Sequence, residues 1–441
     1  MAEPTDPSDA TRAAGMPSRE IALNLISSVL DDRRSLTDVL DRGVRGAEKA
    51  SPADRAFGRL IAVTVLRRLG EIDAIIAERV KRPLPRDAQR VQHVLRIVTA
   101  QISFLGTAPH AAVNCAVEQA KRCPGRYASL VNAVARRFAP IPPDRPVEGK
   151  VNLPGWLWES WSQAYGTDAA GRIAAVQRTE PPLDVSIAVP ADTARWATAL
   201  DGEALIPGTV RLPRARDVPT LPGFADGAWW VQDVAASLPA RLLLAALDDA
   251  PSARIADLCA APGGKTAQLA AAGATVTAVD ADPARLVRLR QNLARLNLTV
   301  AVVAADARTW AGEETFDAVL LDAPCTATGN IRRHPDIPWL KRPADVTQAA
   351  ALQRDLLHNA WRLVRPGGHL VYAVCSLQPE EGKRQIAAFL GETGRRVPIA
   401  AGEVSGLATP DPDGDLQTLP CDQSDRGGMD GFFIARLRKE S

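Results

Sequence analysis

The fold of this chain is decided by the stretch DLCAAPGGKT at residues 257–266. It closes an apolar run at residues 254–259 that is typical of a buried strand, and a helical pattern follows it. The adjacent glycines, Gly263 and Gly264, allow the backbone to approach a ligand closely, and the first N–H groups of the next helix can bind an anionic group. The stretch therefore predicts a ligand-binding turn between a strand and a helix.

Two common nucleotide motifs do not fit this turn. A phosphate-binding P-loop needs a glycine five residues before the Gly-Lys pair, and that position holds Cys259. The dinucleotide fingerprint needs glycines separated by other residues, whereas Gly263 and Gly264 are adjacent. The turn is therefore expected to bind a ligand other than a nucleoside triphosphate or a dinucleotide.

Apolar runs alternate with helical patterns on both sides of this turn. The expected strands lie at residues 254–259, 275–280, 300–306, 316–322 and 368–375, with a long helix at 344–364. Strands separated by helices form a mostly parallel sheet that is covered on both faces. Residues 235–441 are therefore predicted to form a Rossmann-like α/β domain.

Three successive strands of this sheet end at or near an aspartate: Asp257, Asp280 and Asp306. An acidic side chain at the second of these positions can bind two ribose hydroxyls, and the third is placed to reach a purine edge. Any single one of them can instead be a turn or helix-capping residue. The set favours an adenosine-bearing ligand without phosphates, and we expect S-adenosylmethionine.

Two cysteines follow neighbouring strands of the same sheet. Cys325 closes the run Asp322-Ala323-Pro324, and Cys375 follows the next strand. A lone cysteine is usually a small buried hydrophobe, but two at one edge of the sheet suggest chemistry. Carbon 5 of a pyrimidine accepts a methyl group only after a thiolate adds to carbon 6, and a carboxylic acid near N3 assists that addition. The pattern therefore predicts covalent pyrimidine methylation.

The rest of the chain reads as two further regions. Residues 1–17 are expected to be a disordered tail, and residues 18–142 form a helical domain because apolar residues recur at helical spacing without convincing strands. A Pro-rich linker at 139–146 leads to a small α+β region at 150–234. The expected architecture is thus multidomain, with all-α, α+β and α/β parts.

The net charge of +2 hides an asymmetry. Residues 18–140 hold 21 Lys and Arg against 12 Asp and Glu, a net charge of +9, so the remainder is acidic. A basic module suggests a nucleic-acid partner, although well-solvated Arg-rich helices would explain it equally. No apolar run is long enough to span a membrane, and the six sparse cysteines favour reduced thiols in the cytoplasm over disulfides or a metal site.

The sequence resembles the RNA (cytosine-5)-methyltransferases of the Nol/Nop/Sun family. The resemblance covers roughly residues 18–440 and is carried by residues 257–266, 322–325, 329–340, 371–381 and 430–433. In the helical domain, residues 109–114 and 130–137 resemble the NusB-like RNA-binding domain that precedes the catalytic domain in part of this family.

The resemblance implies roles for individual residues. Cys375 is implied as the nucleophile, Cys325 as the thiol that promotes product release, and Asp322 as the contact to N3 of the cytosine. Lys265 is implied near the cofactor and the substrate ribose or phosphate. The implied cofactor pocket comprises Cys259, Ala260, Ala261, Pro262, Gly263, Gly264, Lys265, Asp280, Asp306 and Asp322. Arg332, Arg333 and His334 are candidates for RNA contacts, with a salt-bridged loop as the alternative.

Three points qualify the resemblance. DNA cytosine-5 methyltransferases use the cysteine of a Pro-Cys pair, which here would make Cys325 the nucleophile. The family usually has Ser-Gly-Thr-Gly after that cysteine, whereas this chain has Ala327 in place of the first glycine. Val374 stands where a threonine is usual, so a hydroxyl is lost beside Cys375. No reacting group is removed by these differences.

The expected substrate is RNA whose target base is unpaired or can leave its stack. The resemblance implies ribosomal RNA, namely 16S ribosomal RNA before full subunit assembly, and a monomeric enzyme without a membrane partner. Two alternatives stay open, namely a transfer-RNA cytosine-5 methyltransferase and a non-catalytic RNA-binding factor with a vestigial fold. The roles of Trp229, Trp230, Cys115, Cys123 and Cys421 also stay open, although we interpret the three cysteines as structural.

Overall fold

The computed structural model describes residues 15–142, 145, 147–213, 217–312, 314–390 and 395–440. The chain divides into two compact units, which are described separately. The first comprises Met1–Glu159, Ala170–Arg178 and His334–Lys341, and the second comprises Ser160–Ala169, Thr179–Arg333 and Arg342–Ser441. The expected tail falls mostly on residues 1–14, and the expected linker partly on 143, 144 and 146, all of which lie outside the described residues.

The first unit is helical, which confirms the predicted all-α region. Its helices within the described part of residues 15–142 are α2 (Met16–Leu30), α3 (Leu36–Arg42), α4 (Pro52–Arg67), α5 (Leu69–Ala77), α6 (Gln89–Ser103), α7 (Pro109–Lys121) and α8 (Ala128–Ala135). The start of α4 is capped by Ser51, whose hydroxyl oxygen accepts a hydrogen bond from the Asp54 N–H at 3.1 Å. The apolar faces of α2, α4 and α6 supply about half of the buried core residues.

A distant segment of the chain completes this helical unit. The short helix α15 (Ile337–Leu340) lies in the segment His334–Lys341, which follows the loop of Cys325 in sequence. The indole Nε1 of Trp339 donates to the Leu66 carbonyl at 2.9 Å, and the carboxylate of Asp336 accepts from the Leu36 N–H at 2.9 Å. Trp339 and Leu340 also pack against the helical core.

The second unit is built on an eight-stranded sheet. Seven strands run in the order β10-β12-β9-β8-β5-β6-β7, and β11 pairs with β12. The bounds are β5 (Arg254–Leu258), β6 (Thr275–Asp280), β7 (Ala301–Ala304), β8 (Phe316–Asp322), β9 (Val364–Val374), β10 (Arg395–Arg396), β11 (Leu416–Gln417) and β12 (Phe433–Arg438). The five strands from β9 to β7 are parallel, and β10, β11 and β12 add antiparallel pairs.

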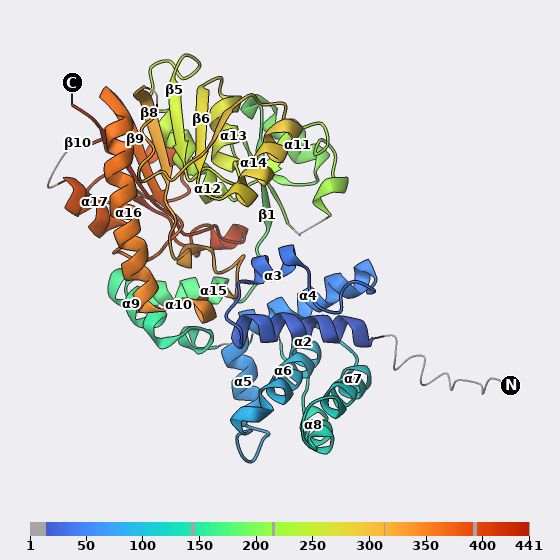
Figure 1. Cartoon of the computed structure of the whole chain (residues 1–441). Coiled ribbons are helices and arrows are strands. Elements are labelled where there is room, and N and C mark those ends of the chain that lie inside the picture. The colour runs from blue at the N-terminus through green and yellow to red at the C-terminus, as the bar shows by residue number, and fades with distance from the viewer. Residues whose placement is uncertain are drawn as a thin grey trace. The chain divides into compact units, whose positions relative to one another are not determined.

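Helices cover both faces of this sheet, as expected for a parallel α/β domain (Figure 1). Alternate strand residues point to opposite sides, so Leu320 packs in one apolar cluster and Leu321 in the other. The first cluster includes α12 (Val234–Leu244) and α13 (Gly264–Ala271), and the second includes α16 (Pro343–Leu363) and α17 (Lys383–Leu390). One further helix, α14 (Pro283–Arg295), packs near β6 and β7. The Rossmann-like prediction is confirmed.

A smaller antiparallel sheet precedes the large one. Its order is β2-β3-β1-β4, with β1 (Leu183–Ile187), β2 (Glu203–Ile206), β3 (Thr209–Leu212), β4 (Trp229–Val231) and the helix α11 (Thr193–Ala199). Trp229 is fully buried in its core. Trp230 instead packs with Ala267 of α13, so this sheet contacts the cofactor-motif helix.

Several local expectations need correction. The α+β region expected at 150–234 begins with two helices, α9 (Gly155–Tyr165) and α10 (Thr167–Val176), which are separate because the chain turns at Gly166 with a φ of 84°. The expected tail ends earlier than residue 17, since α2 already begins at Met16. Strands β2, β10, β11 and β12 were not expected, because they are short or antiparallel and lie outside the alternating pattern.

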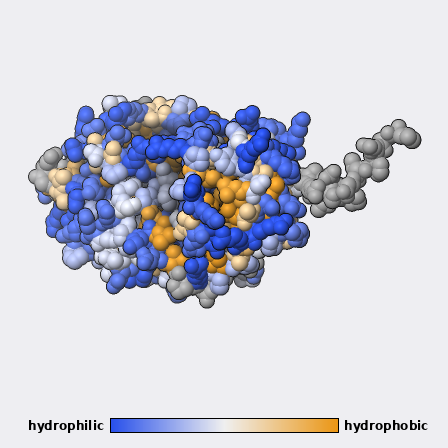
Figure 2. Space-filling model, turned by 90° about the horizontal axis from the view of Figure 1, so that it is seen from below, coloured by the Kyte–Doolittle hydropathy of each residue, from blue (hydrophilic) through white to orange (hydrophobic). Residues whose placement is uncertain are grey.

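Among the helices of the described residues, none combines the length and the apolar character that a membrane crossing requires. The face of the molecule drawn in Figure 2 is largely hydrophilic and carries a patch of hydrophobic side chains.

Candidate active site

The candidate site lies at the carboxyl edge of the parallel sheet, where β5, β6, β8 and β9 end. The topology places β8 between β9 and β5, so the segments that follow these strands lie next to one another. This edge is where open α/β sheets bind ligands. Side chains expected from three separate sequence motifs therefore meet in one place.

The turn after β5 is shaped for close approach of a ligand. Gly263 has a φ of 102° and precedes α13, a backbone conformation that side chains rarely adopt. Cys259 also has a left-handed φ of 60°, and burial raises the pKa of its thiol, which makes it inert. The Asp280 carboxylate fixes the turn by accepting from the Ala261 N–H at 3.0 Å.

Asp257 is a buried carboxyl of this turn with a raised pKa. It is fully buried, and burial raises its pKa to about 7, with the carboxylates of Asp322 and Asp280 adding to the shift. The Thr266 hydroxyl donates to Asp257 Oδ2 at 2.5 Å and opposes the shift, while Oδ1 has no hydrogen-bond partner among the described residues. Three carboxylates held so close favour a positively charged ligand nearby.

The residues of the turn fit S-adenosylmethionine. Its sulfonium and amino groups are cationic, which matches the cluster of Asp257, Asp280 and Asp322. Its carboxylate matches the free N–H groups at the start of α13, because the first turn of a helix has no internal acceptors. When bound, this cofactor supplies an electrophilic methyl group.

Asp306 lies two residues beyond β7 and differs from the other strand-end aspartates. Its side chain is exposed and pairs with the Arg308 guanidinium, which lowers the pKa of Asp306. It also accepts from the Arg308 N–H at 2.9 Å, so it forms a local turn. The turn-residue interpretation describes Asp306 in this structure, and its contact with the cofactor stays a prediction.

Asp322 and Lys265 form an ion pair at the centre of the edge. The Lys265 ammonium lies 2.7 Å from Asp322 Oδ2, and it also lies 5.1 Å from the centroid of the Phe432 ring. The turn after β5 and the end of β8 are therefore joined through one contact. The same pair leaves the other oxygen of Asp322 available to a substrate.

The two candidate catalytic cysteines are neighbours. Their Sγ atoms lie 3.4 Å apart, with Cys325 in the loop after β8 and Cys375 directly after β9. The hydrogen bond with Cys375, together with burial, raises the pKa of Cys325 well above its ordinary value. Cys325 is therefore a thiol at neutral pH and can donate its proton to Cys375.

Sequence reasoning missed the residue that holds the two cysteine loops together. Glu381 is fully buried and accepts from the Thr326 N–H at 2.8 Å and from the Ser376 hydroxyl at 2.9 Å. The Gln353 amide donates to the same carboxylate at 3.1 Å. Thr326 follows one cysteine and Ser376 follows the other, so Glu381 bridges both. An acidic residue six positions after Cys375 was the only signal, and it bears no reacting group.

The structure shows the surroundings of the two positions, Ala327 and Val374, at which this chain differs from the family pattern. Gly329 packs against the backbone of Gly431, where a Cβ atom would lie 1.9 Å from the Gly431 carbonyl oxygen. Ala327 adopts a left-handed φ of 57°, the conformation that glycine favours, so the substitution strains this loop by roughly 1–2 kcal/mol. Val374 is fully buried in an apolar cluster, which a valine suits well.

The expected RNA contact at Arg332 is corrected by the structure. Its side chain is 1% exposed and pairs with Asp233 and with Asp430, the latter at 3.1 Å. A guanidinium held by two buried carboxylates stabilises the fold and cannot reach a phosphate. Arg333 is exposed and also pairs with Asp430, while His334 begins the segment that joins the helical unit.

The fold and the site define a class of protein, namely the Rossmann-like S-adenosylmethionine-dependent methyltransferases. Within it, residues 244–438 match the family model of the 16S rRNA methyltransferase RsmB/F, and residues 16–140 match that of the NusB family. The chain belongs to the RsmB/F family of methyltransferases.

Individual relatives support this assignment. The ribosomal RNA small subunit methyltransferase B of Vibrio cholerae serotype O1 is 37% identical over 452 residues, which cover 96% of this chain and 98% of the relative. The protein of the same name from Salmonella typhi is 36% identical over 450 residues, with the same shares of the two chains covered.

Solved structures show the same architecture. The crystal structure of PH0851 has a TM-score of 0.74 and 25% sequence identity, and the match covers 96% of this chain and 99% of that chain. The structure of NSun6 from Pyrococcus horikoshii with SFG has a TM-score of 0.55 and 19% identity over 65% of this chain and 98% of that chain, which shows the fold.

Proposed function

We propose that this protein transfers a methyl group from S-adenosylmethionine to carbon 5 of a cytosine in 16S ribosomal RNA. The pair of thiols 3.4 Å apart at the cofactor edge of the sheet carries this proposal. The relatives named as small-subunit ribosomal RNA methyltransferases support the choice of RNA. A vestigial binding factor would not need to keep both thiols and Asp322.

The reaction begins with the thiolate of Cys375. Its Sγ adds to carbon 6 of the cytosine, and the ring's electrons make carbon 5 nucleophilic, while Asp322 binds the ring at N3. Carbon 5 then takes the methyl group from the sulfonium, which is left as a neutral thioether, and the C5 proton passes to a solvent water. The Sγ–C6 bond breaks in the same stage, which restores the double bond of the base and returns the electron pair to Cys375.

The proton on Cys325 supports the assignment of Cys375 as the nucleophile. Only a thiolate attacks efficiently, and the pKa of Cys325 is raised by its bond to Cys375 and by burial. Cys325 is thus suited to donate a hydrogen bond to its neighbour and to assist the release of the methylated RNA. Lys265, paired with Asp322, keeps that side chain oriented near the base.

The remaining parts are proposed to bind RNA. The basic helical domain at residues 18–142 binds the RNA backbone, helped by the region at 150–234, and residues 235–441 form the catalytic domain. We further propose that the enzyme acts as a monomer in the cytoplasm, since the proposed catalytic residues all come from one chain. Arg333 and His334 stay candidates for RNA contacts.

Methyl transfer to defined RNAs tests the substrate. The protein is incubated with labelled methyl donor and either unmodified 16S ribosomal RNA or unmodified transfer RNA, and the labelled base is mapped. We expect 5-methylcytosine in the ribosomal RNA. Label only in transfer RNA would move the substrate to that class, and label in neither RNA would refute the enzymatic proposal.

Trapping of the covalent intermediate tests the roles of the cysteines. Cys325→Ser should accumulate a protein–RNA adduct that survives a denaturing gel, because release is impaired after Cys375 has attacked. Cys375→Ser should be inactive without an adduct, and Cys421→Ser, which alters a thiol outside the cofactor turn and the cysteine pair, serves as the matched control. An adduct with Cys375→Ser would reverse the assignment.

A further inference from the structure

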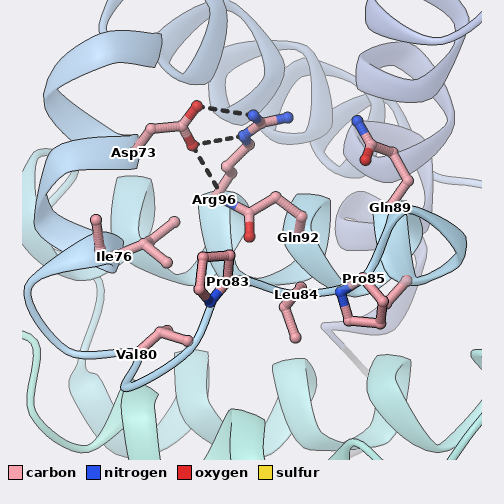
Figure 3. Close-up of a pocket in the computed structure, with 11 residues that line it drawn as sticks. Asp73, Ile76, Val80, Pro83, Leu84, Pro85, Gln89, Gln92 and Arg96 are labelled. Carbon is pink, nitrogen blue, oxygen red and sulfur yellow. Dashed lines mark hydrogen bonds and ion pairs between the residues drawn. The ribbon is translucent and has the colours of Figure 1, made fainter.

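A pocket of about 470 Å³ lies in the helical unit, and none of its lining residues belongs to the candidate active site (Figure 3). It is formed by α5, the loop after α5 and the start of α6. Its lining residues are Asp73, Ile76, Ala77, Val80, Pro83, Leu84, Pro85, Ala88, Gln89, Gln92 and Arg96. The volume falls in the range of roughly 300–1,000 Å³ that is usual for small-ligand sites.

The pocket has an apolar wall and a polar wall. Ile76, Val80 and Leu84 form the apolar side together with two prolines (Figure 3). On the other side, the Arg96 guanidinium binds the Asp73 carboxylate through two hydrogen bonds of 2.8 and 2.7 Å, and the Gln92 amide donates to it at 3.2 Å. The pocket therefore offers a flat apolar surface beside fixed hydrogen-bonding groups.

The polar wall is held in place from behind. Arg96 also lies 3.0 Å from Nδ1 of His93, which is fully buried, and His93 Nε2 lies 3.0 Å from the Asp31 carboxylate. This chain of contacts fixes the guanidinium plane. Because Asp73 and Arg96 neutralise each other, the wall presents donors and acceptors with little net charge.

The segment at residues 81–87, which supplies the lining residues Pro83, Leu84 and Pro85 and is called the rim below, is basic. Lys81, Arg82 and Arg86 are exposed on this segment, and within the described residues none of the three has an ion-pair partner. One exposed carboxylate, Asp87, lies beside them, so the rim keeps a net positive charge. Free cations around an uncharged pocket suit a ligand whose body is planar and whose periphery is anionic.

We propose that this pocket binds one unpaired nucleotide of the substrate RNA. The base lies against the apolar wall with its edge toward Gln89, Gln92 and Asp73, while Lys81, Arg82 and Arg86 contact the flanking phosphates. Splayed single-stranded bases are the usual targets of sequence-specific RNA recognition. This inference rests on the proposed function only in taking RNA as the substrate. A bound protein segment would fill the apolar wall but would not explain the basic rim.

A pair of matched variants tests the pocket. Ala77 is exposed and lines the pocket, so Ala77→Phe fills it, whereas Ala74→Phe adds the same side chain to an exposed position of α5 outside the pocket. For Ala77→Phe we expect the KM for naked 16S ribosomal RNA to rise roughly 5- to 150-fold, the range for losing one base contact, with kcat unchanged. Ala74→Phe should stay within about twofold of the unmodified protein, and melting curves verify that both variants fold.

A second measurement does not depend on a filled pocket or on catalysis. Ribosomal RNA substituted with 4-thiouridine is irradiated with the full-length protein, and cross-linked peptides are mapped. We expect cross-links within residues 76–92, weakened by Gln89→Ala. The inference would be overturned if all cross-links lay outside residues 76–92 and if Ala77→Phe and Ala74→Phe had equal KM values for the RNA.

The outcomes separate this inference from the proposed function. If the unmodified protein methylates RNA while Ala77→Phe behaves like Ala74→Phe, the pocket proposal fails and the proposed function stands. If no RNA is methylated but cross-links map to the pocket, the proposed function fails and the pocket proposal stands. If Ala77→Phe impairs only the methylation of RNA that already carries ribosomal proteins, the pocket binds a protein segment and the nucleotide proposal is overturned.

Discussion

Glu381 determines the relative position of the two thiols without reacting itself. Its carboxylate accepts hydrogen bonds from both cysteine loops, and the Tyr372 hydroxyl donates to its backbone carbonyl at 2.6 Å. Burial raises the pKa of Glu381, against the hydrogen bonds from Thr326 that lower it. Residues that orient catalytic groups in this way matter because small misplacements of reacting atoms are costly.

Replacing Glu381 should therefore affect turnover more than binding. For Glu381→Ala we expect kcat to fall about 10- to 100-fold with less than about a twofold change in the KM for the methyl donor, and for Glu381→Gln a smaller fall, because the amide keeps one acceptor. Glu380→Ala is the matched control, since Glu380 pairs with Arg384 at the surface. A merely structural role would lower the folded fraction while leaving the kcat of the folded enzyme unchanged.

The buried Asp257 makes the stability of the free enzyme depend on pH. Its folded-state pKa of about 7 exceeds the unfolded value of about 3.9, so the protonated carboxyl stabilises the fold below pH 4 and this contribution is lost as the pH rises to about 7. The loss amounts to roughly 4 kcal/mol at most. A bound cationic cofactor would offset this loss of stability at pH values near and above 7, where Asp257 is ionised.

Denaturation in urea at several pH values checks this linkage. Without cofactor, the free energy of unfolding of the unmodified protein should fall relative to that of Asp257→Asn between pH 4 and 7, because the amide cannot ionise but still accepts from Thr266. Asp306→Asn changes an exposed strand-end aspartate and should not show the effect. Parallel curves for the unmodified protein and Asp257→Asn would contradict the assigned pKa.

Individual residues were predictable where their chemistry left a pattern. Asp257, Lys265, Asp322 and the cysteine pair follow strands, and the structure brings them together at one edge. The RNA contact predicted at Arg332 was wrong, because an arginine that binds buried carboxylates looks the same in sequence as one that faces RNA. Such partners lie about 100 residues away, and no local pattern reveals them.

At the scale of elements, α15 shows how one short helix belongs to a distant core. Its segment packs against α2 and α4, where Trp339 contacts the Leu66 carbonyl and Asp336 caps the start of α3 by binding the Leu36 N–H. The helix is four residues long and has no strong periodicity, so its place could not be predicted from sequence. The longer α16 and the five parallel strands were predictable because their apolar patterns are extended.

Removing this anchor should loosen the segment. For Trp339→Ala we expect a loss of about 1–3 kcal/mol in the stability of the helical unit, less than for a fully buried tryptophan, and faster proteolysis within residues 334–341. Trp339→Phe keeps the packing and loses only the hydrogen bond, so its loss should be about 1 kcal/mol. Unchanged melting and protection in Trp339→Ala would contradict this role.

At the scale of the whole molecule, the division into a basic helical part and an α/β part was predictable from composition and periodicity. The way in which residues 150–178 are shared between the two units was not. Arg178 binds the buried Glu71 at 2.8 Å and joins the first unit, whereas the Tyr165 hydroxyl donates to the Leu377 carbonyl at 2.7 Å in the second. These pairings are tertiary and leave no trace in local hydropathy.

The late position of α15 has a consequence for biosynthesis. The helices α2 to α8 of the first unit are complete by Ala135, yet the residues that cover the Leu66 carbonyl lie at 334–341. At roughly 5–20 residues per second, the ribosome needs on the order of 10–40 s to extend the chain from residue 140 to residue 341. Throughout that interval the nascent helical unit exposes apolar surface that chaperones and proteases can recognise. A nascent chain that stalls before residue 334 therefore keeps this apolar surface exposed, and we expect it to be degraded faster than the full-length protein.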